Sequence, residues 1–177
     1  MANTNAPDGF TPAYHMSGGV IRPQEFAIAS GTNASIFSGD VVNLSSGLVI
    51  QGTATGTPLG VFYGVEYRAT DGSVVFSNMW TADVATLGAA NAKAFVYVDP
   101  DIVYEAQSTG TPTQASIGTT NTISTTAGNT NNGRSKEGVT VTTSSGIATV
   151  VGFPDKPNNT IGQYARVYVT FPASTFG

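Results

Sequence analysis

The sequence predicts an all-β fold: a β-sandwich or jelly-roll-like domain with an extended N-terminal arm. Short runs rich in Val, Ile, Tyr, Phe and Thr recur along the chain, and Gly, Pro, Asn, Asp and Ser residues separate them. Such runs are typical of strands joined by turns. The one segment with helix propensity is Ala82–Ala92, but its short length and its internal Gly88 favour a loop. We therefore expect many short strands and almost no helix.

The composition limits what this protein can do. Its 177 residues fit one domain, which we place at residues 24–177, after an arm at residues 1–23. Because the chain has no cysteine, it forms no disulfide, thiolate metal site or cysteine nucleophile. Only 10% of the residues are charged, and the 7 basic residues are scattered, which argues against nucleic-acid binding. No apolar run approaches the length of about 18 residues that a membrane span needs, so we expect no membrane partner.

The arm has neither a helical nor a strand period, because prolines and glycines interrupt it throughout. It nevertheless carries aromatic and apolar residues, in which disordered tails are poor. We expect it to be extended and to dock through these side chains, either across its own domain or across a neighbouring subunit. The candidate contact residues, with a capsid or another subunit, are Phe10, Tyr14, His15, Met16 and Arg22.

The first half of the domain has the clearest strand signals. Leu59–Ala69 alternates between two faces, as a half-buried strand does, and Asp71-Gly72 then supports a hairpin turn into Val74–Trp80. Trp80 is the only tryptophan, and we expect it to anchor the core, with a sugar-stacking platform as the alternative reading. Shorter strands are predicted at Glu25–Ser30, Asp40–Leu44 and Leu48–Gln51, the last two as a hairpin.

The stretch Lys93–Gln107 organises the chain. It contains two β-prone runs, Ala94–Val98 and Ile102–Ala106, on either side of an Asp-Pro-Asp step. Pro100 has no amide hydrogen and a fixed φ, so it cannot sit inside a central strand. The stretch therefore predicts a strand, a rigid corner and a second strand, with the corner taking the chain from one sheet into another.

The last part of the chain is rich in Thr, Ser, Asn and Gly, and residues 106–133 carry no charge. Threonine is β-branched and favours strands, so we expect weak strands there rather than disorder. The predicted elements are strands at Gln114–Gly118 and Thr122–Thr125, a turn at Asn129–Gly133, a hairpin of Gly138–Thr143 with Gly146–Gly152 around Ser144–Gly146, a loop at Phe153–Thr160 and a final strand at Ala165–Phe171.

No catalytic constellation is evident, so we expect a protein that is not an enzyme and has no cofactor or metal. His15 is the only histidine, and no spaced partner lies near it in the sequence. Asp99 and Asp101 could be the two acids of a glycoside hydrolase. On an exposed corner, however, nothing raises the pKa of either carboxyl, as the general acid of such an enzyme requires. Calcium binding by Asp99, Asp101 and Glu105 is conceivable, yet the spacing lacks that of a calcium loop.

Several segments resemble virion proteins of tailed phages, namely small capsid decoration or cement proteins: MANTNAPDGFTPAYHMSGG, GVEYR, VDPDIVYEAQ and VGFPDKPNNTIG. The resemblance implies a mostly β virion structural protein on the outer surface of the capsid head. It would bind the major capsid protein, clamp neighbouring capsid subunits and assemble as a small homo-oligomer. A trimer is favoured by analogy with the threefold positions of a head lattice.

The alternative function is a carbohydrate- or receptor-binding β module of a phage tail or fibre. A hydroxyl-rich β surface of low charge, together with Trp80 and 7 tyrosines, also suits such a role.

Overall fold

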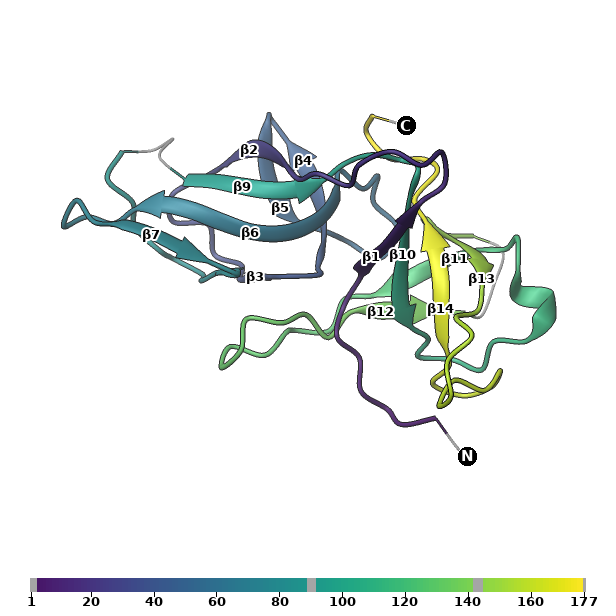
Figure 1. Cartoon of the computed structure of the whole chain (residues 1–177). Coiled ribbons are helices and arrows are strands. Elements are labelled where there is room, and N and C mark those ends of the chain that lie inside the picture. Colours follow the sequence, from purple (N-terminus) through teal and green to yellow (C-terminus); the bar gives the residue numbers. More distant parts are fainter. Residues whose placement is uncertain (1–2, 89–91, 142–144, 177) are drawn as a thin grey trace.

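The computed structural model describes residues 3–88, 92–141 and 145–176. It confirms the all-β, sandwich-like fold: two six-stranded sheets and a two-stranded sheet contain all the strands of these residues, and a single 3-10 turn, Gln114–Ser116, is their only helical element. Figure 1 shows the two larger sheets as neighbouring bodies. The strands are β1 (Thr11–His15), β2 (Gln24–Ile28), β3 (Ile36–Phe37), β4 (Val41–Ser45), β5 (Leu48–Gln51), β6 (Gly60–Arg68), β7 (Val74–Ser77), β8 (Met79–Trp80), β9 (Ala92–Tyr97), β10 (Ile102–Gln107), β11 (Thr120–Ser124), β12 (Gly138–Thr140), β13 (Ala148–Gly152) and β14 (Arg166–Thr170).

We call the larger sheets the open sheet and the closed sheet. The open sheet has the order β1-β10-β14-β13-β11-β12. The closed sheet has the order β4-β5-β2-β9-β6-β7, and an additional pairing of β4 with β6 closes it into a ring. Each sheet covers its own cluster of buried side chains. Neighbouring residues of β4 belong to different clusters, since Val41 lies in the core of the open sheet and Val42 in that of the closed sheet.

The predicted corner is confirmed. β9 belongs to the closed sheet and β10 to the open sheet, and the Asp-Pro-Asp step lies between them. In Figure 1, β9 runs along the closed sheet and β10 turns away from it. Val98 is buried in one core and Ile102 in the other, so the corner delivers side chains to both.

The beginning of the arm is a packed element, which corrects the sequence prediction for residues 10–15. β1 is the edge strand of the open sheet and pairs antiparallel with β10. Phe10 is only 1% exposed, and its ring meets Phe171 edge-on at 5.3 Å between centroids. The strand pattern was hidden because Pro12 breaks it and the register shifts between Pro12 and Tyr14, which an edge strand tolerates.

Two strand predictions in the first half of the domain also need correction. β6 contains a bulge between Phe62 and Gly64, so Phe62 and Val65 enter the same core while Tyr63 is exposed. The strand predicted at Val74–Trp80 is split, because β7 pairs with β6 whereas β8 pairs with β3. Trp80 is fully buried at the end of β8, as expected for a core anchor, and it is therefore no sugar platform.

In the last part of the chain, the predicted strand at Gln114–Gly118 is instead the 3-10 turn Gln114–Ser116 followed by a hydrogen-bonded turn at Ile117 and Gly118. The predicted hairpin of Gly138–Thr143 with Gly146–Gly152 is wrong, because β11 lies between β12 and β13 in the sheet. The threonine-rich β11 can pair on both edges, which is why it displaces the local hairpin. Residues 142–144 of that prediction, like residues 89–91 of the predicted loop, lie outside the described residues.

Gly9 tests whether the start of the arm is part of the core. It has a φ of +80°, and an added Cβ would lie 2.5 Å from Ser135 Cβ. Gly18 is a matched control, because its φ is +75° and nothing lies within 4 Å of an added Cβ. We expect Gly9→Ala to lower the free energy of unfolding by about 1–3 kcal/mol more than Gly18→Ala, the cost of overpacking. Urea denaturation measures both, and equal losses would show that Gly9 is not tightly packed.

Candidate functional site

The structure divides the five predicted contact residues into two groups. Tyr14 and Met16 are 45% and 55% exposed, and Arg22 is exposed as well. Phe10 is in the core of its own chain, so its assignment as a contact with another protein is wrong. The side chain of His15 is only 7% exposed. Only the first three can therefore meet a partner without a conformational change.

His15 is held at the corner between the sheets, although the sequence suggested no partner for it. Its Nε2 lies 3.0 Å from Oδ2 of Asp99, and the neighbouring Ser17 hydroxyl donates to Oδ2 of Asp101 at 2.8 Å. The amide of Gly19 donates to Nδ1 of His15 at 3.1 Å. We call these interactions of His15 and Ser17 with the two corner aspartates the corner tie, because they fasten the end of β1 to the corner.

The hydrogen bonds define the state of the imidazole. Since the Gly19 amide donates to Nδ1, that nitrogen carries the lone pair, and Nε2 carries the proton that it donates to Asp99. The bond from His15, followed by that from the Asp101 amide, lowers the pKa of Asp99 below its ordinary value. A carboxylate with these donors stays ionised, which makes it a hydrogen-bond acceptor and a poor proton donor.

The corner tie also brings together three potential metal ligands. The ligand atoms of His15, Asp99 and Asp101 lie within 4.8 Å of one another. A metal at Nε2 would need the lone pair there, and its histidine normally donates from Nδ1 to an acceptor. Here Nδ1 faces the Gly19 amide, which is a donor, so the arrangement does not suit a metal ion at His15.

The calcium set considered from the sequence is not assembled. Glu105 does not join Asp99 and Asp101, because its carboxylate pairs with Lys156 at 2.6 Å and with Arg166 at 3.5 Å. The ion pair of Glu105 with Lys156 thus holds the loop before β14 against the sheet formed by β10 and β14.

The geometry does not favour hydrolytic chemistry at the corner. The lowered pKa of Asp99 is the opposite of what the acid of a glycoside hydrolase needs. Ser17 lies 3.2 Å from Nδ1 of His15, but its hydroxyl donates to Asp101 instead of to the imidazole. The nearby amides of Gly18 and Gly19 both donate to His15, so neither is free to bind an oxyanion.

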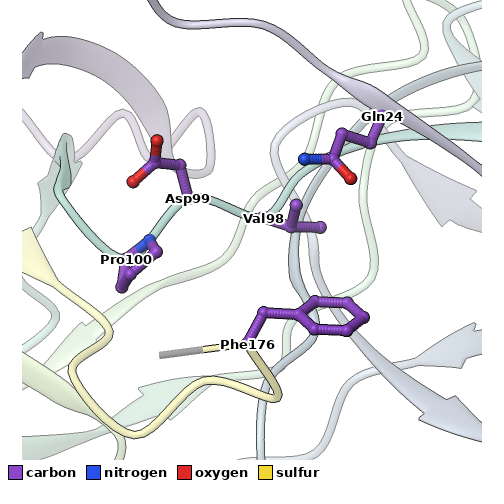
Figure 2. Close-up of a pocket in the computed structure, with 5 residues that line it drawn as sticks. All are labelled: Gln24, Val98, Asp99, Pro100 and Phe176. Carbon is purple, nitrogen blue, oxygen red and sulfur yellow. The ribbon is translucent and has the colours of Figure 1, made fainter. Parts of the chain in front are cut away.

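An open groove of about 370 Å³ lies beside the corner and is lined by Gln24, Val98, Asp99, Pro100 and Phe176. Phe176 stacks on Phe26 of β2, with 6.1 Å between ring centroids. In Figure 2, the carboxylate of Asp99 points away from both the Phe176 ring and the Gln24 side chain. The polar groups of the groove therefore do not converge on one point.

A double-mutant cycle of His15→Ala and Asp99→Ala measures the corner tie. Because Asp99 is 44% exposed, we expect a coupling of only about 0.5–1 kcal/mol near neutral pH, from urea denaturation. The lowered pKa means that this contribution is complete above the ordinary value of 3.8 and is lost as the pH falls through the folded-state value. The control pair is Lys93 with Glu25, at 3.2 Å and more than half exposed, which should show weaker coupling. Equal coupling in the two pairs would contradict a special role for the tie.

A scan against protein-family models, a search of curated proteins and a search of solved structures found no match to this chain. Among the described residues, no helix is long and apolar enough to cross a membrane.

Proposed function

We propose that this chain is a virion structural protein that binds the outer surface of a tailed-phage head and cements neighbouring major capsid subunits. The observation that carries the proposal is an exposed apolar segment whose first turn is held by hydrogen bonds, next to the edge strand of the open sheet. We call this segment, residues 16–23, the strap; it leads from β1 in the open sheet to β2 in the closed sheet.

The strap surface consists of Tyr14 of β1 together with Met16, Val20 and Arg22 of the strap. The first three are 45%, 55% and 70% exposed, and Arg22 adds a cation at the far end. Exposed apolar residues clustered in one segment are typical of protein interaction sites. The Tyr14 ring packs edge-on against Tyr168 at 5.4 Å, so its position is fixed before any partner binds.

The corner tie supports this role because it orders the first turn of the strap. Ser17 bonds to Asp101 within the tie and the Gly19 amide donates to the imidazole of His15, so this part of the strap is already fixed in the free protein. A partner that binds to an ordered segment does not have to supply the entropy of ordering it. Among the described residues, no strand pairs with the outer edge of β1, so an extended capsid segment could add there as a further strand.

The composition fits a protein that works while bound to others. With 10% charged residues, much of the surface is neutral and hydroxyl-rich, which suits close packing against a protein shell. A shell repeats each contact many times, so a modest area per copy accumulates into strong overall attachment. Homo-oligomers, with a trimer favoured, would match the symmetry of such a lattice.

The test is binding to phage heads that lack this protein. We expect the double variant Met16→Asp and Val20→Asp to bind at least about tenfold more weakly in co-sedimentation, because two apolar contacts become buried charges. The control is Ile161→Asp, which changes a residue of similar exposure, 46%, in the loop before β14 and should bind as the wild type does. Unchanged binding of the double variant would exclude the strap as the contact. Absence of the protein from the outer head surface in electron cryomicroscopy of particles would exclude the function.

A further inference from the structure

A second pair of acids lies at the junction of the two cores, away from the corner tie. Asp40 directly precedes β4 and Glu137 directly precedes β12, and each is 1% exposed. Both are therefore among the few acids of the chain that water does not reach. Lone buried carboxylates are costly, so such a pair needs a compensating group.

The backbone supplies only part of that compensation. The amide of Phe37 donates to Oδ2 of Asp40 at 2.8 Å, and the amide of Val41 donates to Oε2 of Glu137 at 2.8 Å. Oδ1 of Asp40 is buried without a hydrogen-bond partner, although the Ser135 hydroxyl lies close enough to the carboxyl to lower its pKa, by less than burial raises it. The carboxyl of Glu137, which is held by the amide of Val41 directly after Asp40, is the group whose proton would satisfy Oδ1.

Cations do not neutralise the pair. Arg134 and Lys136 flank Glu137 in the sequence, but both are exposed, on the opposite side of the segment from Ser135 and Glu137. Asp8, the acid of the segment that packs here, is itself paired with Arg166 at 3.0 Å. Burial raises the pKa of Asp40 to about 6. Burial, with repulsion from Asp40 as the second cause, raises the pKa of Glu137 to about 9.

The N-terminal segment closes over this junction. The amide of Phe10 donates to the carbonyl of Gly39 at 2.9 Å, next to Asp40. The Cα of Gly9 faces Ser135 so closely that no side chain would fit between them. The segment is anchored further out by Gln107, whose side-chain amide donates to Thr4 and whose oxygen accepts from Ala6. Its inner end thus rests on Gly39 and Ser135, both of which lie beside Asp40.

We propose that Asp40 and Glu137 share one proton near neutral pH and form a pH-sensitive latch that holds residues 3–10 over the junction. With the proton present, one carboxyl donates to the other and the junction stays dry. When the proton is lost in alkali, two like charges face each other in a buried site, and water must enter. The contacts of Gly9 and Phe10 are the ones that must then open, because they cover the pair.

The sign of the effect follows from the direction of the shifts. An acid whose pKa is raised on folding binds its proton more tightly in the folded state, so the closed form is most stable at low pH. This stability declines as the pH rises through about 6 and is lost above about 9. The corner tie has the opposite dependence, so the two devices can be distinguished.

The experiment is hydrogen exchange of the full chain, read at the Phe10 amide and corrected for the intrinsic rate at each pH. Between a pH below 6 and a pH above 9, we expect wild-type protection to fall at least about tenfold. Glu137→Gln keeps the shape and a proton donor, and its protection should change less than about twofold over the same range. The control Glu25→Gln removes a surface acid and should behave as the wild type does.

Asp40→Asn is the second variant, should Glu137→Gln fail to fold, and it should reduce the pH dependence, because the repulsion between the two carboxylates is removed while burial still acts on Glu137. A wild type without pH dependence, or a dependence that survives undiminished in both variants, would overturn the latch. Calcium chloride provides one more test above pH 9. If it restores the protection of the wild type but not that of Glu137→Gln, a bound cation and not a shared proton holds the pair, and the latch is overturned.

Discussion

The corner at Asp99–Pro100–Asp101 is the constraint on which the rest of the structure depends. A proline cannot extend the hydrogen-bond ladder of β9, so the chain must leave the closed sheet and begin a strand elsewhere. Two other segments pass the same place: the strap is fastened there by His15 and Ser17, and Phe176 lines the groove beside Pro100. One rigid tripeptide thus determines where the two cores meet.

Elements with strong local signals were predictable from the sequence. The hairpin of β4 with β5, the turn from β6 into β7 and the corner each follow from turn residues between alternating runs. β1 was missed because Pro12 and a bulge conceal its pattern, and its partner β10 lies far away in the chain. The pairing of β12 with β11 instead of β13 was missed for a related reason: sequence proximity favours hairpins, whereas the sheet order is decided by burial of the whole core.

The functional residues show the same division between local and distant causes. The aspartates of the corner could be placed on an exposed turn, but the sequence cannot show that His15, 84 residues away, bonds to one of them. The buried pair was missed altogether, since Asp40 follows a turn signal that usually marks the surface. One signal was available: the alternation Arg134, Ser135, Lys136, Glu137 leads into buried Val139 and places Ser135 and Glu137 on the inner face.

β1 is held at each end by carboxylates in opposite environments. At its end, the corner tie uses Asp99, whose pKa is lowered and whose side chain is partly exposed, so acid weakens it. At its start, Phe10 rests beside buried acids that need a proton, so alkali weakens that end. The proposed contact surface begins on this strand, and its geometry therefore depends on both. We therefore expect the proposed contact surface to begin on an edge that is ordered across the intermediate pH range, where both ends of β1 are closed, and to loosen from a different end at each pH extreme.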